Sequence, residues 1–375
     1  MNASPSRLYT IDALRGLAAL SVCWFHFTYD SGKFLPDGFL KSSGEFGQLG
    51  VEIFFVISGF VIPYALHRGG YQILDYNRFV LKRVIRLSDY GTFILKRIVR
   101  LEPPYLCAIL FAIGIQYAIP GYGVAPFHFL IVQVFLHLGY VNEFFGYPWL
   151  IGVFWTLGIE MQYYLLVGLL FPVIAHKSLI VRICCFGCLA SLAFIDEIGL
   201  IFDWLFLFML GMAAFQFRVG ICQRREYFAW MVVIGLGAWY VNGSTVAITA
   251  IATALLLGLV ETGAKNPLLF FGRISYSLYL LHSPIGALVM GLSIPFVHTM
   301  SGKCAVLAAT LAASIISAWL LYRFVERPAQ EWSSRIRYRK KQGILWKTAA
   351  GIIGCCVTGY LIFALAIAVA EAHSR

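Results

Sequence analysis

Two basic side chains interrupt the first apolar stretch of the chain, IDALRGLAALSVCWFHF (residues 11–27). Arg15 and His26 are eleven residues apart, so a helix would place both on one face, about 16 Å apart along its axis. An imidazole can take up and return a proton near neutral pH, whereas a guanidinium stays charged and binds phosphate or carboxylate. Because both groups are costly in hydrocarbon, we expect this face to line a polar cavity. A snorkelling arginine and a hydrogen-bonded core histidine are the alternative that these two residues leave open.

A short repeat places six further cations at matching positions of its two copies. The segments YNRFVLKRVIRL (76–87) and YGTFILKRIVRL (90–101) are offset by 14 residues, which is close to four helical turns, so both copies present the same face. Two interpretations stay open: an interfacial membrane anchor, and a cradle for an anionic, nucleotide-type cofactor, which we favour. The cations are Lys82, Arg83 and Arg86, then Lys96, Arg97 and Arg100.

Four more ionisable side chains lie in apolar surroundings, namely Glu52, Glu160, His282 and Glu326. A single buried carboxylate is often structural. Several of them together with His and Arg indicate either a reaction chamber or a proton path.

The sequence lacks the motifs of several other kinds of catalytic and metal-binding site. There is no Gly-x-Ser-x-Gly nucleophile elbow, no His-Glu-x-x-His sequence and no Asp-rich cluster, so we expect no metal. There is also no nucleic-acid motif, and we expect no nucleic-acid partner. The nine cysteines lie nearly all in apolar runs, where they act as small hydrophobic side chains.

These residues need a scaffold that crosses a membrane. Of the 375 residues 60% are hydrophobic and only 13% are charged, and the mean hydropathy is +0.79. Apolar runs near the spanning length of about 20 residues recur throughout, and the alternating strands of a barrel are absent. We therefore predict an all-α, polytopic transmembrane bundle of about 10–11 spans. The expected spans are 10–29, 47–66, 103–119, 152–175, 181–196, 199–217, 228–242, 245–261, 273–294, 303–323 and 348–369.

The distribution of Lys and Arg predicts the orientation. If the N-terminus is cytoplasmic, every basic connection falls on the cytoplasmic side, provided that residues 121–150 do not cross. The formal net charge of +11 then reflects cytoplasmic loops. The first apolar run is too long for a cleavable signal. We expect a multi-pass protein of the cell (inner) membrane.

Six stretches in order resemble the acyltransferase family 3 integral membrane proteins. They are IDALRGLAALSVCWFHF, GVEIFFVISGF, LKRIVRLEPPY, FWTLGIEMQYYL, RISYSLYLLHSPI and RFVERP. The resemblance covers about residues 7–330, so we divide the chain into a membrane acyltransferase domain (1–330) and a basic loop with an extra C-terminal helix (331–375).

The resemblance implies an O-acyltransferase that takes an acyl group, often acetyl, from cytoplasmic acyl-CoA. The acceptor would be a hydroxyl of an extracytoplasmic glycan or glycolipid, such as a lipid-linked sugar. By motif position His26 matches the essential histidine and Arg15 its partner, while Glu160 matches an acidic position of the family. Arg97 and Arg100 match the family's Arg-x-x-Arg element, and Arg83 and Arg86 form an extra copy, which leaves open which pair is functional.

In this interpretation the basic cluster holds the CoA phosphates and His26 is a general base for the acceptor hydroxyl. Glu160 would orient or charge-stabilise the imidazole, and transient acylation of His26 stays an alternative. For acceptor contact we expect the segment 121–150, including His137 and Trp149. A transporter or flippase with a His/Glu proton relay is the competing hypothesis, and a membrane scaffold is a third, which leaves the intramembrane charges unexplained.

Overall fold

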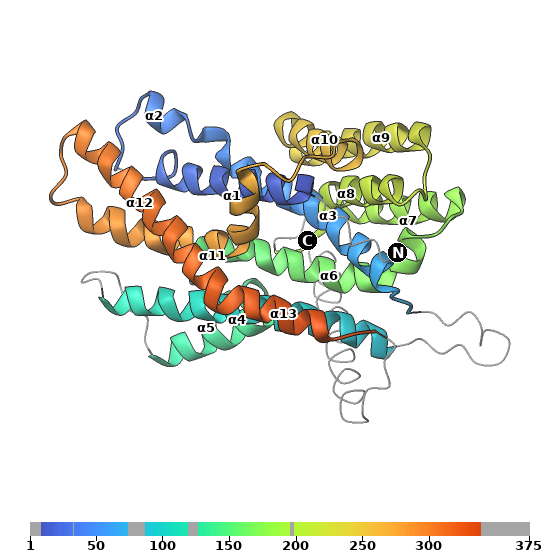
Figure 1. The fold of residues 1–375 in the computed structure, drawn as a ribbon, viewed down its shortest axis with the longest axis horizontal. Coiled ribbons are helices and arrows are strands. Elements are labelled where there is room, and N and C mark those ends of the chain that lie inside the picture. The colour runs from blue at the N-terminus through green and yellow to red at the C-terminus, as the bar shows by residue number, and fades with distance from the viewer. Residues whose placement is uncertain (1–8, 33, 74–86, 119–126, 196–198, 339–375) are drawn as a thin grey trace.

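The fold is a bundle of helices (Figure 1). The computed structural model describes residues 9–32, 34–73, 87–118, 127–195 and 199–338. Within these ranges the chain forms helices and no strand, which confirms the all-α prediction. The predicted span at 348–369, and with it most of the predicted C-terminal segment, lies outside the described residues, as do Lys82, Arg83 and Arg86 of the first basic copy.

The helices follow one another along the chain. Their bounds are α1 (Tyr9–Phe27), α2 (Phe39–Ser42), α3 (Gly50–Gly69), α4 (Leu87–Ala118), α5 (Phe127–Gly139), α6 (Trp155–Ile174), α7 (Leu179–Leu192), α8 (Leu205–Arg218), α9 (Arg224–Asn242), α10 (Ser244–Leu259), α11 (Leu268–Ser293), α12 (Met300–Leu321) and α13 (Arg327–Arg335). A π-helical turn (Tyr322–Glu326) joins α12 to α13.

Several of these helices suit a bilayer. Four stretches of the described chain are long and apolar enough to cross a membrane, namely Phe39–Gly69, Asp89–Tyr117, Gly152–Ile174 and Met300–Arg335. The protein is thus a multi-pass membrane protein. The count of ten or eleven spans stays a prediction.

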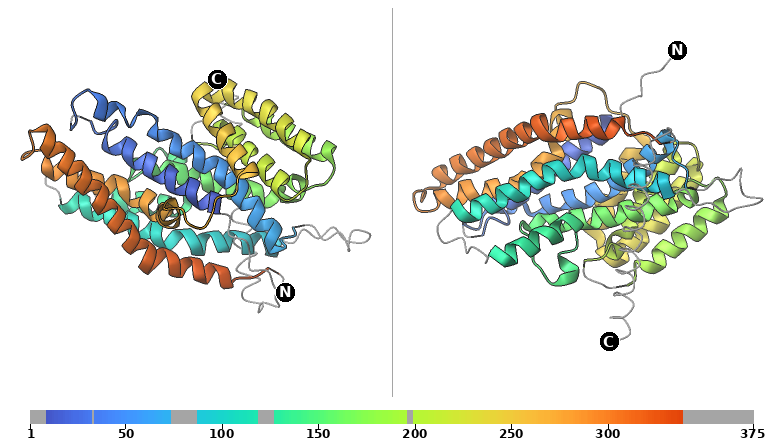
Figure 2. Two further views of the ribbon diagram at one scale, coloured as in Figure 1. Left: turned by 45° about the horizontal axis from the view of Figure 1, so that its top comes forward. Right: turned by 90° about the horizontal axis from the view of Figure 1, so that it is seen from below.

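Helix α3 connects two parts of the bundle. It packs against α1 on one side and against α8 and α10 on the other, while α8, α9 and α10 pack on one another. Helix α11 lies between α1 and α12, and α4 runs along α11 and α13. Figure 2 shows the long helices extending in broadly the same direction.

Glycines allow the closest helix contacts. A Cβ atom on Gly272 of α11 would lie 1.9 Å from the carbonyl oxygen of Asp12 in α1. A Cβ atom on Gly211 of α8 would lie 2.1 Å from the carbonyl oxygen of Val56 in α3. Backbones can approach this closely only where a side chain is missing, as is common between helices in membranes.

Helix α4 differs from the prediction. We expected its span to begin at residue 103, after a basic connection, but a single helix of 32 residues begins at Leu87. Tyr90, Phe93 and Ile94 are fully buried in it. The second basic copy therefore lies within the bundle and not on a surface helix, because its arginines find a polar cavity inside.

The two ends of the bundle differ in charge. One end contains the starts of α1, α7 and α9 and the ends of α6, α8 and α10, which are joined by contacts such as Thr10 to Val260, Gln216 to Ile174 and Arg182 to Glu226. Of the described residues, Lys177, Arg218, Arg224 and Arg225 lie at these helix ends. We call it the basic end.

We predict that Gly211→Val separates α3 from α8. Overpacking of this kind costs about 1–3 kcal/mol, so the melting temperature and the yield of monodisperse protein in detergent should fall. The matched control is Gly187→Val in α7, where a Cβ atom meets nothing within 4 Å. Equal behaviour of the two variants would contradict the close α3–α8 contact.

Candidate functional site

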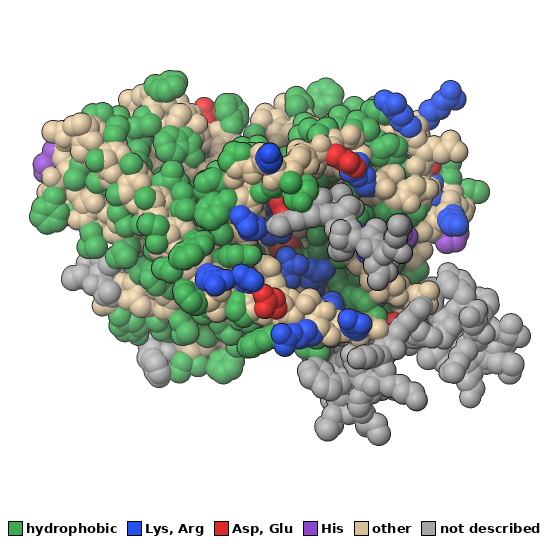
Figure 3. All heavy atoms as spheres, in the orientation of Figure 1, with side chains coloured by type: hydrophobic (Ala, Val, Ile, Leu, Met, Phe, Trp, Pro, Cys, Tyr) green, Lys and Arg blue, Asp and Glu red, His purple; other side chains and the backbone are tan. Residues whose placement is uncertain are grey.

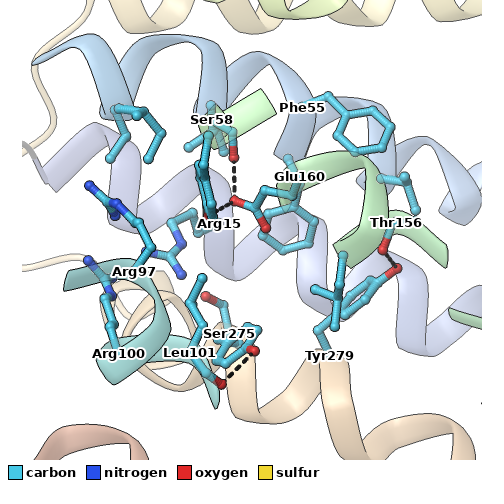
Figure 4. Close-up of a pocket in the computed structure, with 18 of the residues that line it drawn as sticks. Arg15, Phe55, Ser58, Arg97, Arg100, Leu101, Thr156, Glu160, Ser275 and Tyr279 are labelled. Atoms are coloured by element: carbon cyan, nitrogen blue, oxygen red, sulfur yellow. Dashed lines mark hydrogen bonds between the residues drawn. The ribbon is translucent and has the colours of Figure 1, made fainter. Parts of the chain in front are cut away.

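A cavity of about 90 Å³ lies inside the bundle. Its polar lining comes from six elements: α1, α3, α4, α6, α11 and the π-helical turn. Figure 4 shows Arg97 and Arg100 on one side, Thr156 and Tyr279 on the other, and Glu160 between them. In Figure 3 a hollow in one face of the molecule is surrounded by Lys and Arg side chains, with acidic groups among them. The polar lining residues are Arg15, Ser58, Arg97, Arg100, Thr156, Glu160, Tyr164, Ser275, Tyr276, Tyr279 and Glu326.

Three guanidinium groups converge on this cavity. Arg15 comes from α1, and Arg97 and Arg100 come from α4. None of the ion pairs within the described part of the chain involves any of them, and the buried Nε of Arg97 has no hydrogen-bond partner there. Three cations that share a cavity without a carboxylate within 4 Å have the chemistry to hold an anion, because guanidinium groups match phosphate and carboxylate geometry.

The carboxylate of Glu160 is already hydrogen-bonded within the cavity. Ser58 Oγ donates to Glu160 Oε1 over 2.8 Å, and the hydroxyl of Tyr164 donates to the same oxygen. Arg97 stacks on the ring of Tyr164 at 5.4 Å. Glu160 is therefore fixed on the wall beside the arginines, at a distance that leaves their N–H groups available.

Glu326 supplies a second, more deeply buried carboxylate. It is 2% exposed, and its Oε2 accepts hydrogen bonds from the backbone N–H and the hydroxyl of Ser277. Gln330 donates to its other oxygen over 2.8 Å. The π-helical turn that ends at Glu326 brings this side chain to the cavity, and such turns occur often at functional sites. Arg15 and Arg100 are its electrostatic neighbours.

Lys96 lies apart from the two arginines of its copy. Its Nζ donates to the carbonyl oxygens of Ser333 (3.0 Å) and Ile336 (2.5 Å) at the C-terminal end of α13. Ser333 Oγ donates in return to the carbonyl oxygen of Lys96. A cation at a helix C-terminus satisfies carbonyls that have no partner in the helix. Lys96 thus fastens α13 to α4 and does not line the cavity.

His26 does not line the cavity either. Its Nδ1 is 2.9 Å from Oδ2 of Asp30, one turn further along. Since a carboxylate only accepts, Nδ1 carries the proton and Nε2 of the neutral ring keeps its lone pair. The side chain of His26 is 25% exposed and that of Asp30 58%, so the pair lies at the edge of the bundle, at the end opposite the basic end.

Aromatic side chains separate His26 from the cavity. Tyr279 lines the cavity and packs against Phe54 at 5.8 Å and against His282 at 5.7 Å. The ring of His282 lies 5.2 Å from the ring of His26. Tyr279 and His282 therefore lie between the cavity and His26.

The expected contact between Glu160 and His26 is not present. Glu160 bonds Ser58 and Tyr164, and Asp30 is the acid that orients His26. The reason is the axial distance from Arg15 to His26 in α1, which puts the imidazole beyond the level of the cavity. The i, i+4 spacing of His26 and Asp30 was the available signal for this partner.

His137 serves the local fold of the 127–150 segment. It is fully buried, its Nδ1 contacts the carbonyl oxygen of Gln133 (2.7 Å), and its Nε2 accepts from the backbone N–H of Leu150 (3.1 Å). The expectation that this side chain contacts an acceptor is therefore wrong.

Residues 8–323 match the family model of the acyltransferase domain known as acyltransferase family 3. The match covers most of the chain and contains Arg15, His26, Arg97, Arg100 and Glu160. No curated protein and no solved structure matches the chain.

We predict that Lys96→Met weakens the docking of α13. The loss of charge-assisted bonds to two carbonyls should lower the free energy of unfolding by about 1–3 kcal/mol, measured by thermal melting. Lys177→Met is the control, because that side chain is exposed. An unchanged melting temperature of Lys96→Met would contradict the anchoring role.

Proposed function

Because the chain belongs to acyltransferase family 3, whose members are membrane enzymes that transfer acyl groups, we propose that it is an O-acyltransferase. It moves an acyl group, acetyl in particular, from cytoplasmic acyl-CoA to a hydroxyl of an extracytoplasmic glycan or lipid-linked sugar. The observation that carries this proposal is the convergence of Arg15, Arg97 and Arg100, without ion-pair partners among the described residues, on one cavity inside the bundle.

The arginines suit the anionic donor. Acyl-CoA has phosphate groups at one end and a thin pantetheine arm that ends in the thioester. We place the basic end of the bundle in the cytoplasm, following the excess of Lys and Arg there. The phosphate end then meets cations first, and the arm extends past Tyr279 toward His26.

The chemistry takes place at His26. Asp30 keeps Nδ1 protonated, so Nε2 can accept the proton of the acceptor hydroxyl. The hydroxyl oxygen attacks the thioester carbonyl, the carbon–sulfur bond breaks, and the proton passes from His26 to the sulfur of CoA. The products are an ester and free CoA thiol, so atoms and charge balance.

The exposed position of the His26–Asp30 pair suits a large acceptor. A glycan or a lipid-linked sugar is too bulky for a cavity of about 90 Å³, whereas a hydroxyl presented at the edge of the bundle reaches a half-buried imidazole. Donor and acceptor would thus approach from opposite ends of the bundle.

The proposal is tested with His26→Ala and Asp30→Asn in membranes of the producing cell, supplied with labelled acetyl-CoA. His26→Ala should abolish label transfer to the endogenous acceptor. Asp30→Asn should lower kcat by about 100-fold or more, because the imidazole loses its oriented tautomer. Asp37→Asn is the control, since Asp37 pairs only with Lys41 among the described groups. Normal transfer by His26→Ala, at unchanged protein level, would overturn the mechanism.

Substitutions of the cavity arginines test where the donor binds. We predict that Arg97→Met and Arg100→Met raise KM for acetyl-CoA about tenfold or more, because each removes a charge-assisted phosphate contact. Lysine at either position should restore only part of the affinity. Arg68→Met, which lies outside the cavity lining, should leave KM unchanged. An unchanged KM in both cavity variants would show that the donor does not bind in this cavity.

A further inference from the structure

A second imidazole, that of His282, is buried beside His26. His282 lies in the middle of α11 and has no exposed surface. Its Nδ1 is 2.8 Å from the carbonyl oxygen of Tyr279 and 3.2 Å from that of Leu278. Its Nε2 is buried and has no hydrogen-bond partner among the described residues. A buried polar atom without a partner is rare and calls for an explanation.

The hydrogen bonds fix the tautomer of His282. Carbonyl oxygens only accept, so Nδ1 carries the proton and Nε2 carries the lone pair. Nδ1 faces the carbonyls of its own helix, which leaves Nε2 at the distal edge of the ring. Nε2 of His282 is therefore a hydrogen-bond acceptor without a donor among the described residues.

The nearest candidate donor is His26. The two ring centres are 5.2 Å apart and the rings are tilted by 42°. An N–H···N bond of about 2.9 Å between two imidazoles separates their ring centres by about 5 Å. A small rotation of the His26 side chain, which is 25% exposed, would thus suffice to form the N–H···N bond to His282.

The neutral form of His26 cannot donate to His282, because its one proton is directed at Asp30. The protonated form has a second N–H group, on Nε2. We propose that His282 is a positioning residue of the transfer centre, whose Nε2 accepts a hydrogen bond from the imidazolium of His26. This inference rests on the proposed function, since it takes His26 as the general base.

The step needs no further reactant. The acceptor hydroxyl gives its proton to His26 Nε2, and the resulting imidazolium is held between Asp30 and His282 until the proton passes to the sulfur of CoA. His282 gains and loses no proton itself. An interaction that exists only with the charged intermediate lowers the barrier without tightening substrate binding.

Two isosteric variants separate this role from a structural one. His282→Asn keeps a donor near the Tyr279 carbonyl but has no atom at the position of Nε2. His282→Gln places an amide oxygen near the position of Nε2 and gives up the backbone bond. We expect His282→Asn to lower kcat for acetyl transfer roughly 100-fold with KM for acetyl-CoA unchanged, and His282→Gln to stay within about tenfold of the native chain.

The coupling to His26 is tested with a double variant. In an Asp30→Asn background, which keeps measurable transfer, His282→Asn should cause a smaller fold-loss of kcat than in the native chain, because residues that act as a unit are not additive. Thermal melting of each full-length variant in detergent shows whether it is folded. A misfolded His282→Asn would lose transfer by the same factor in both backgrounds and would melt at a lower temperature.

The outcomes distinguish the two proposals. Native activity in His282→Asn, or better activity in His282→Asn than in His282→Gln, would overturn the role of Nε2 while leaving the acyltransferase assignment intact. No acetyl transfer from acetyl-CoA by the native chain would overturn the proposed function itself.

Discussion

The structure depends on keeping three guanidinium groups inside an apolar bundle. A charged side chain in hydrocarbon is costly, so it must face water, a partner or a cavity. Arg15, Arg97 and Arg100 meet this constraint by sharing one cavity with Glu160 and Glu326. The two carboxylates are hydrogen-bonded by Ser58, Tyr164, Ser277 and Gln330, so they moderate the positive charge without neutralising each arginine in an ion pair. The lining therefore keeps an excess of positive charge.

The remaining helices can be understood as support for this arrangement. Close glycine contacts bring α1 to α11 and α3 to α8, which encloses the cavity between them. Lys96 fastens α13 to α4, and α13 follows directly on the π-helical turn that carries Glu326. The polar lining is thus assembled from segments far apart in sequence, each held by contacts outside the cavity.

Much of this could be predicted from the sequence because it depends on single helices. Hydropathy identified the all-α class, and the spacing of Arg15 and His26 placed both on α1. How one helix packs against another could not be predicted from the sequence. The positions of Tyr279 and His282 between the cavity and His26 depend on how α11 packs against α1, and no pattern within one helix contains that information.

The structure places three of the predicted residues differently from the expectation, and the reasons are similar. Glu160 was assigned to His26 because both are intramembrane ionisable groups, yet its hydrogen bonds lie with Ser58 and Tyr164, and the acid beside His26 is Asp30. Lys96 was grouped with Arg97 and Arg100 by its position in a repeat, although adjacent residues of a helix point about 100° apart. His137 was expected at a surface because it lies in a proline-rich and glycine-rich segment, but it bonds the backbone of that segment internally.

Helix α1 carries Arg15 near one end and His26 near the other, within one unbroken run from Tyr9 to Phe27. In the proposed reaction this helix sets the distance between the cavity that holds the phosphates of the donor and the imidazole that acts at its thioester. Lengthening it by one residue would turn the imidazole by about 100° and move it about 1.5 Å. In that reaction the length of α1 would select the donor, because a donor with a shorter arm would be held by its phosphates with its thioester out of reach.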